Sequence, residues 1–207
     1  MTNQLYQFLD EKIVYLDGAM GTMIQQYSLQ EEDFKGNLFK SFSQELKGNN
    51  DLLSLTKPEI IKEIHTQYLE SGSNIISTNT FSSTRIAQAD YDLEEFAKEM
   101  NIQSAKIAKE AKSEFQKKNP NKNIWVAGAF GPTNRTASIS PDVNDPSYRA
   151  VTFDELCENY LEQAEGLSEG GVDIFIVETV FDTLNLKAAI FAIEKFKEKY
   201  PDKNIPL

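Results

Sequence analysis

Three polar residues that end predicted strands could together bind a small charged ligand. Asp17 follows an apolar run and precedes Gly18, while Asn79 and Glu178 close two later apolar runs. A short apolar run that stops at an acid and glycines is typical of a buried parallel strand that delivers a carboxylate to a loop. Asp17 and Glu178 could hold an ammonium group, while N–H groups of the glycine turn hold a carboxylate. The pattern therefore predicts a site for a small zwitterion.

A purely structural role fits the same two acids. In this interpretation Asp17 and Glu178 form ion pairs with Arg85 or Arg135 at the strand ends. The residue types and their spacing favour neither interpretation over the other.

Composition excludes several classes of partner and site. The 207 residues carry a net charge of −11, which argues against nucleic acid or an anionic membrane as the main partner. The N-terminus lacks the basic start and apolar core of a signal peptide, and no apolar run approaches the ~20 residues that span a bilayer. One cysteine, Cys157, and one histidine, His65, exclude a disulfide framework and a Cys/His metal cluster within this chain. We therefore expect a cytoplasmic protein.

Four βα units are expected to position these residues. The predicted strands cover 13–17, 74–81, 124–130 and 173–179, and Ile205 begins a fifth strand. Polar residues and glycines at the ends of alternating strands and helices indicate a parallel α/β architecture with one functional face. A doubly wound sheet would require a G-x-G-x-x-G fingerprint after the first strand, and residues 18–21 lack that spacing. We therefore predict part of a (β/α)8 TIM barrel.

Capping signals mark where the predicted helices begin. Thr56 and Thr152 each stand three residues before a glutamate, as in a capping box, and Asp182 caps the last helix. Another helix is expected over 90–118. Cys157 lies on an apolar stripe, which favours a core position over a nucleophile or ligand, and His65 lies beside another stripe and is assigned no role.

The junctions that lead into two of the strands repeat in sequence. Residues 72–80 align without gaps on 171–179, which predicts that Asn79 and Glu178 lie at the same depth in the sheet. Within a single domain of residues 1–207, we expect 27–50 to be an insertion folded over one end of the sheet and 131–151 to be a long loop.

Five segments together resemble the homocysteine-binding module of cobalamin-dependent methionine synthases, within the homocysteine S-methyltransferase family. They are L-D-G-A-M-G-T-M-I (16–24), L-K-G-N-N-D-L-L (46–53), T-N-T-F (78–81), G-P-T-N-R-T-A-S-I-S-P-D-V-N-D-P (131–146) and E-T-V-F-D-T-L-N (178–185). The first and last segments are typical of homocysteine methyltransferases generally, whereas 131–146 resembles the cobalamin-dependent branch. The resemblance covers nearly the whole chain from about Ile13.

The resemblance implies a role for each matching residue. Asp17 and Glu178 would bind the amino group of homocysteine, and Asn79 would line the pocket. The backbone around Gly18, Ala19 and Met20 would contact the carboxylate end of the substrate. The loop with Asn134, Arg135 and Asp142 would shape the mouth of the pocket or receive the cobalamin module.

The resemblance also implies cofactors and partner modules. Zinc would bind the substrate sulfur as a thiolate, which takes a methyl group from methylcobalamin to give methionine, and methyltetrahydrofolate would reload the cobalamin. Cobalamin- and folate-binding modules would belong to the same parent polypeptide. The three cysteines that hold zinc in the family have no counterpart here, so we expect an amino-terminal fragment of a barrel, without catalytic or metal-ligating residues and inactive alone.

Two other functions stay open on the sequence. One is a homocysteine methyltransferase that uses another donor, betaine or S-methylmethionine, against which segment 131–146 argues. The other is a half-barrel that binds a ligand or partner without chemistry, as the missing zinc ligands would allow.

Overall fold

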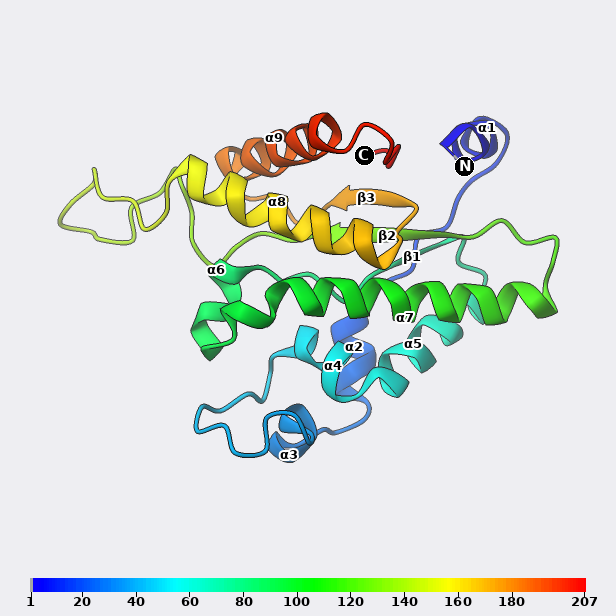
Figure 1. Ribbon diagram of the computed structural model, residues 1–207, viewed down its shortest axis with the longest axis horizontal. Helices are drawn as coiled ribbons and strands as arrows, with labels where there is room; N and C mark the ends of the chain where they lie inside the picture. Colours follow the sequence, from blue (N-terminus) through cyan, green and yellow to red (C-terminus); the bar gives the residue numbers. More distant parts are fainter. Residues whose placement is uncertain (1) are drawn as a thin grey trace.

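Three parallel strands form the centre of the computed structural model, which describes residues 2–207 and the side chains from Leu5 onward (Figure 1). The strands are β1 (Ile75–Ser77), β2 (Trp125–Phe130) and β3 (Ile174–Val177), in the order β1-β2-β3. A helix follows each strand before the next begins, which confirms the predicted parallel α/β class.

The helices differ widely in length. The α-helices are α1 (Thr2–Glu11), α2 (Met20–Gln25), α3 (Glu31–Lys35), α4 (Leu53–Thr56), α5 (Pro58–Ser71), α6 (Arg85–Gln88), α7 (Ala97–Lys118), α8 (Phe153–Gly170) and α9 (Thr183–Lys199). Three 3₁₀ turns, η1 (Asn50–Leu52), η2 (Ala89–Tyr91) and η3 (Glu94–Phe96), complete the assignment.

The two faces of the sheet are covered differently. On one face, Ile76, Phe130 and Phe175 pack in a large apolar core that includes side chains of α8 and α9. On the other face, Leu5 of α1 packs against Trp125, beside Ala127 and Ile174. Because strand side chains alternate between faces, one set of strand residues packs against the long helices and the other set includes the residues that pack with α1.

The predicted first strand is largely wrong. Only Leu16 forms a parallel bridge, to Ile75, and the N–H of Asp17 donates to the Ile75 carbonyl at 2.9 Å. Ile13 is 78% exposed and Tyr15 is also exposed, although the sequence predicts a buried strand. The apolar run therefore pairs with the sheet only at its end, where it delivers Asp17.

The predicted ends of the other strands also differ from the structure. β1 stops at Ser77, because the N–H of Thr80 turns back to the Thr78 carbonyl at 2.9 Å instead of continuing the ladder. At the expected fifth strand, the Pro206 carbonyl accepts a hydrogen bond from Phe175 of β3 at 2.8 Å, and Ile205 is buried.

The predicted helix begins at Pro58 as expected, and two of the three predicted helix caps are confirmed. Thr152 forms the predicted capping box with Glu155, and Asp182 caps α9 by accepting hydrogen bonds from the N–H groups of Leu184 and Asn185. The box at Thr56 is wrong, because this residue is already the last of α4 and its hydroxyl donates to the Leu52 carbonyl.

The predicted helix over 90–118 begins late. Asp92 has a left-handed φ of 55°, which separates η2 from the following turns, and the regular helix α7 begins at Ala97. A left-handed residue cannot continue a right-handed helix, so a single conformation at Asp92 explains the difference.

Asn79 and Glu178 were predicted to lie at the same depth in the sheet, and the register of the hydrogen-bonded strands shows that this prediction is wrong. Ser77 pairs with Ala127, which pairs in turn with Ile174, whereas the sequence alignment matches Ser77 with Ile176. The strands are therefore staggered by two residues relative to the alignment, as expected in a sheet with the shear of a barrel.

The sulfur and imidazole side chains lie inside the protein. Cys157 belongs to α8 and is buried in the core, as predicted. His65 is fully buried in α5 instead of lying at the edge of its apolar stripe, and burial lowers its pKa to about 4.

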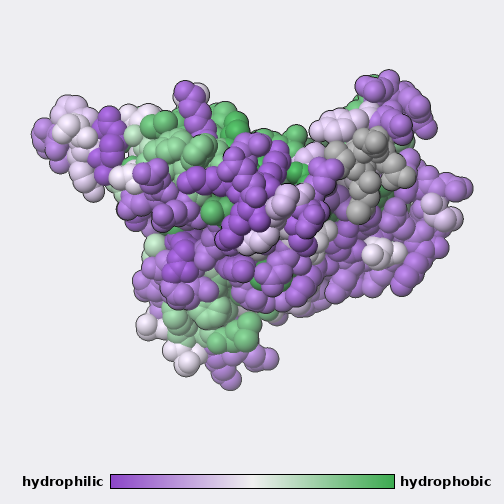
Figure 2. Space-filling view, turned by 45° about the horizontal axis from the view of Figure 1, so that its top comes forward, coloured by the Kyte–Doolittle hydropathy of each residue, from purple (hydrophilic) through white to green (hydrophobic). Residues whose placement is uncertain are grey.

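The surface is mostly hydrophilic, with apolar groups in places. Figure 2 shows hydrophobic surface gathered beside the projecting 131–151 loop, in the region where Figure 1 places α9. The exposed side chains of α9 include Ile190 and Phe191. No helix among residues 2–207 has the length and apolarity required to cross a bilayer.

Candidate functional site

A cavity of about 520 Å³ lies where the strands end and brings the predicted ligand-binding residues together. It is lined by Leu16, Asp17, Gly18, Ala19, Met20, Gly21, Gly48, Asn49, Asn50, Asp51, Ser77, Thr78, Asn79, Thr80, Phe81, Ser82, Tyr91, Ile176 and Glu178. All six predicted substrate-binding residues are in this set. The carboxyl ends of parallel strands are the usual place for a site in α/β folds, because loops diverge there.

Asp17 is held at the edge of β1. One carboxylate oxygen, Oδ2, accepts a hydrogen bond from the backbone N–H of Ser77 at 2.8 Å. Burial raises the pKa of Asp17 to about 7, and the nearby negative charge of Glu178 adds to this effect. Both carboxylates line the same cavity, and a bound cation would favour their ionised forms.

Glu178 is placed by the turn that follows β3. Its backbone N–H donates to the Phe130 carbonyl at 3.0 Å, which extends the ladder by one residue. The Thr179 hydroxyl donates to Oε2 of Glu178 at 3.4 Å, and burial raises the pKa of Glu178. Thr179 has a φ of 54°, which is costly for a β-branched residue. Backbone strain of this kind is concentrated at functional sites.

Asn79 lies in the wall of the cavity with its amide group already engaged. Nδ2 donates to the Asn50 carbonyl at 2.8 Å and to the Ser54 hydroxyl at 3.3 Å. Its backbone N–H donates to the hydroxyl of Ser104 at 2.7 Å. Asn79 therefore joins the end of β1 to η1 and α4 and gives the cavity a fixed wall.

The glycine-containing segment after Asp17 forms one side of the cavity. Gly18 and Ala19 lead directly into α2, which begins at Met20. All three residues line the cavity, as predicted from their position after the first apolar run.

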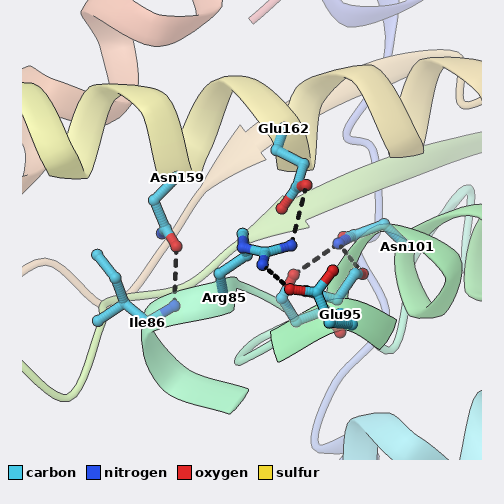
Figure 3. A network of polar contacts seen from close by, with 8 residues as sticks. Arg85, Ile86, Glu95, Asn101, Asn159 and Glu162 are labelled. Atoms are coloured by element: carbon cyan, nitrogen blue, oxygen red, sulfur yellow. Dashed lines mark hydrogen bonds and ion pairs between the residues drawn. The ribbon is translucent and has the colours of Figure 1, made fainter. Parts of the chain in front are cut away.

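The structural interpretation of the two acids, as partners of arginines, is wrong. Figure 3 shows the guanidinium group of Arg85 between Glu95 and Glu162, and both carboxylates form ion pairs with it. The guanidinium group of Arg135 forms an ion pair with Asp90, at 3.9 Å from Nη2 to Oδ1. None of the described residues that line the cavity is Lys, Arg or His. The cavity therefore presents carboxylates without a cation of its own, an arrangement suited to a positively charged ligand group.

The three loop residues lie elsewhere. Asn134 donates to Oδ2 of Asp90 at 2.6 Å, and Oδ1 of Asp142 accepts the N–H of Asn144 at 2.8 Å within the loop. Arg135 lines a different cleft, between α6 and α8. None of the three is among the cavity-lining residues, so their contact with a partner module stays a prediction.

Asp51 and Tyr91 are among the polar cavity residues that the sequence reasoning missed. Asp51 is buried, and its Oδ1 accepts hydrogen bonds from Ser82 N and Ser83 Oγ, both at 2.9 Å. Burial raises the pKa of Asp51 to about 6. The available signal was the 46–53 segment that resembles the family, since Asp51 lies in it directly after the stretch interpreted as an insertion.

The described residues do not supply a zinc site. Among residues 2–207, no three His, Cys, Asp or Glu side chains are grouped so that they could hold a metal ion. Cys157 is enclosed in the core, and burial raises the pKa of its thiol, so the thiolate that zinc requires is disfavoured.

Comparisons with known proteins agree with this architecture. A family model described as homocysteine S-methyltransferase matches residues 14–206. Two solved structures of the homocysteine methyltransferase MmuM from Escherichia coli, an oxidized and a metallated form, each share 22% sequence identity and a TM-score of 0.69 over 95% of the chain. An apo form of the same protein gives 19% identity and a TM-score of 0.61 over 93% of the chain.

The chain spans only part of the length of these proteins. It covers 62% of the oxidized form, 63% of the metallated form and 58% of the apo form. At this level of identity the likeness establishes the fold, and the predicted membership of the barrel class is confirmed.

Proposed function

Because the chain belongs to the homocysteine S-methyltransferase family, we propose that its cavity binds homocysteine as the acceptor of a methyl group. The observation that carries the proposal is the pair formed by Asp17 and Glu178. Both carboxylates line the cavity at the strand ends, burial raises the pKa of each, and none of the described residues that line the cavity is Lys or Arg.

The two acids would position homocysteine through its ammonium group. A charge-assisted hydrogen bond to a partly buried carboxylate is stronger than one between neutral groups. The substrate carboxylate would then point toward the backbone of Gly18, Ala19 and Met20, away from the acids that repel it. Asn79 would form a wall, with its amide held by Asn50 and Ser54.

For the donor, we propose methylcobalamin, with methionine as the product and methyltetrahydrofolate as the ultimate methyl source. Support comes from the resemblance of segment 131–146 to the cobalamin-dependent branch. In the structure, this loop is fixed at its base, where Asp182 accepts hydrogen bonds from the N–H and the hydroxyl of Ser138. Its outer part, residues 141–149, is exposed, as a surface that receives another module would be.

The sulfur chemistry would be completed by residues outside this chain. The side chains described here do not fit zinc, so the proposed role of the chain is to bind and orient the amino-acid part of homocysteine. The cobalamin- and folate-binding modules of a parent polypeptide and a cytoplasmic location belong to the same proposal.

Titration calorimetry with homocysteine tests the proposal on the chain itself. Glu178→Gln should weaken binding by about one to two decades, because one charge-assisted hydrogen bond contributes about 1.5–3 kcal/mol. The matched control is Glu162→Gln, which removes an acid that lies outside the cavity and pairs with Arg85. Equal affinities of the wild-type protein and Glu178→Gln, both folded, would contradict the proposal.

A methyl-transfer assay on the parent protein decides the donor. Isotope-labelled methyl groups should reach homocysteine from methylcobalamin and not from betaine or S-methylmethionine. Transfer from either of the latter alone would replace the proposed donor and leave the acceptor site unchanged.

A further inference from the structure

The cavity has a second polar end that the proposed homocysteine site does not use. Asp51 is 6% exposed, and its contacts to Ser82 and Ser83 both involve Oδ1. Oδ2 accepts no hydrogen bond from the part of the chain that the structure describes. Because Asp51 lines the cavity, this second oxygen is available to a ligand.

Tyr91 lies at the same end of the cavity. Its hydroxyl also has no hydrogen-bond partner among residues 2–207, and the negative charge of Asp51 adds to burial in raising its pKa. The hydroxyl would lie 3.9 Å from a Cβ atom placed on Gly48, so a larger residue at position 48 would contact it. Asp51 and Tyr91 therefore line the same cavity, each with an oxygen that no described residue bonds.

Asp51 reaches the cavity from a different part of the chain than the acids proposed to bind homocysteine. Asp51 is anchored on η1 and holds the 82–83 turn, whereas Asp17 and Glu178 end the strand segments. The cavity of about 520 Å³ has the size of sites for ligands larger than one small amino acid, which typically measure ~300–1,000 Å³.

Homocysteine cannot satisfy both ends at once. Its single ammonium is its only N–H group, and Asp17 and Glu178 are proposed to take it. Its carboxylate would be repelled by Asp51, and a thiol is a weak donor. The oxygen of Asp51 that Ser82 and Ser83 leave free is therefore suited to a different group that carries N–H hydrogens.

We propose that Asp51 and Tyr91 form a subsite that accepts N–H groups of the methyl donor. The inference rests on the proposed function and adds the place where the second substrate is recognised. The N–H groups have two chemical sources, the carboxamides of a corrin ring or the ammonium of a sulfonium amino acid. Either source would donate its N–H hydrogens to a carboxylate oxygen of Asp51 and to the phenol oxygen of Tyr91.

The experiment uses two probes, methylcobalamin and S-methylmethionine, on the chain near pH 8, where Asp51 is ionised. Excess methionine fills the end at Asp17 and Glu178, so that a second amino acid does not bind there. Calorimetry should detect one of the two probes, and the probe that binds identifies the source. Asp51→Asn and Tyr91→Phe should each weaken it about tenfold.

The control is Asp90→Asn. Asp90 is exposed, also acts on the pKa of Tyr91, and does not line the cavity, so its neutralisation should leave probe affinity within twofold. Tyr91→Phe keeps the bonds from Asp51 to Ser82 and Ser83, so it tests the subsite even if Asp51→Asn unfolds.

Two results would overturn the subsite. One is that neither probe binds the wild-type protein, and the other is that Asp51→Asn and Tyr91→Phe bind as well as wild type. Methionine alone provides the separate test of the proposed function, because its affinity should depend on Glu178 and not on Asp51. If methionine does not bind, the proposed function fails, and titration of the probes without methionine still tests the subsite.

Discussion

Replacing Asp17 with Asn should change how the stability of the protein depends on pH. Burial raises the pKa of Asp17 from 3.8 to about 7 in the folded state. Between these values the folded carboxyl keeps a proton that the unfolded chain releases. The folded state therefore binds more protons, and the free energy of unfolding must fall as pH rises through this window.

The size of the effect follows from the two pKa values. Between about pH 5 and about pH 8, this single group lowers the free energy of unfolding by roughly 2–3 kcal/mol, since one pKa unit corresponds to about 1.4 kcal/mol. Partial exposure of Asp17 reduces the effect, so about 1–3 kcal/mol is expected. Asp51 also lowers the free energy of unfolding as the pH rises, because burial raises its pKa to about 6.

Urea denaturation of the wild-type protein and Asp17→Asn at about pH 5, 6, 7 and 8 measures the contribution of Asp17. The variant keeps an oxygen that can accept the Ser77 N–H, and it should lose the part of the slope between about pH 5 and pH 7 that Asp17 contributes. Identical pH dependence in the two proteins would show that the carboxyl of Asp17 is solvated, and the reasoning about the cavity would be refuted.

Three further outcomes are expected. Thr179→Gly should raise the free energy of unfolding by about 1 kcal/mol in a thermal melt, because glycine adopts the φ of 54° without strain; an unchanged or lower melting temperature would contradict this. Gly131→Ala should destabilise the protein by about 2–3 kcal/mol in urea, since its Cβ would lie only 2.3 Å from the Phe81 carbonyl oxygen; a neutral effect would show that the turn adapts. After dialysis, elemental analysis should find well under one zinc per chain, and stoichiometric, chelator-resistant zinc would show that the assignment of Cys157 to the core is mistaken.

The architecture was predictable because long helices and central strands carry their own periodic signals. β2 and β3 lie where apolar runs predict them, and Thr152 and Asp182 cap their helices as expected. The first apolar run failed as a strand because an apolar sequence does not reveal how many strand neighbours it will have. Ile13 and Tyr15 are exposed, and only Leu16 bridges to β1.

The candidate site was predicted in part. Asp17 and Glu178 stand out because each ends an apolar run, and both line one cavity. Asp51 and Tyr91 were missed because they come from η1 and η2, whose short turns have no periodic signal. The ion-pair partners of Arg85 could not be predicted from the sequence either, because Glu95 and Glu162 belong to different elements (Figure 3).

Binding of methionine compared with its analogue without the amino group, 4-(methylthio)butanoate, tests the central claim most directly. Calorimetry on the wild-type chain should show a preference for methionine of about one to two decades, because only methionine presents an ammonium to Asp17 and Glu178. In the double variant Asp17→Asn, Glu178→Gln, that preference should disappear while the weak affinity for the analogue stays the same. A preference that survives in the folded double variant would show that these carboxylates do not bind the amino group.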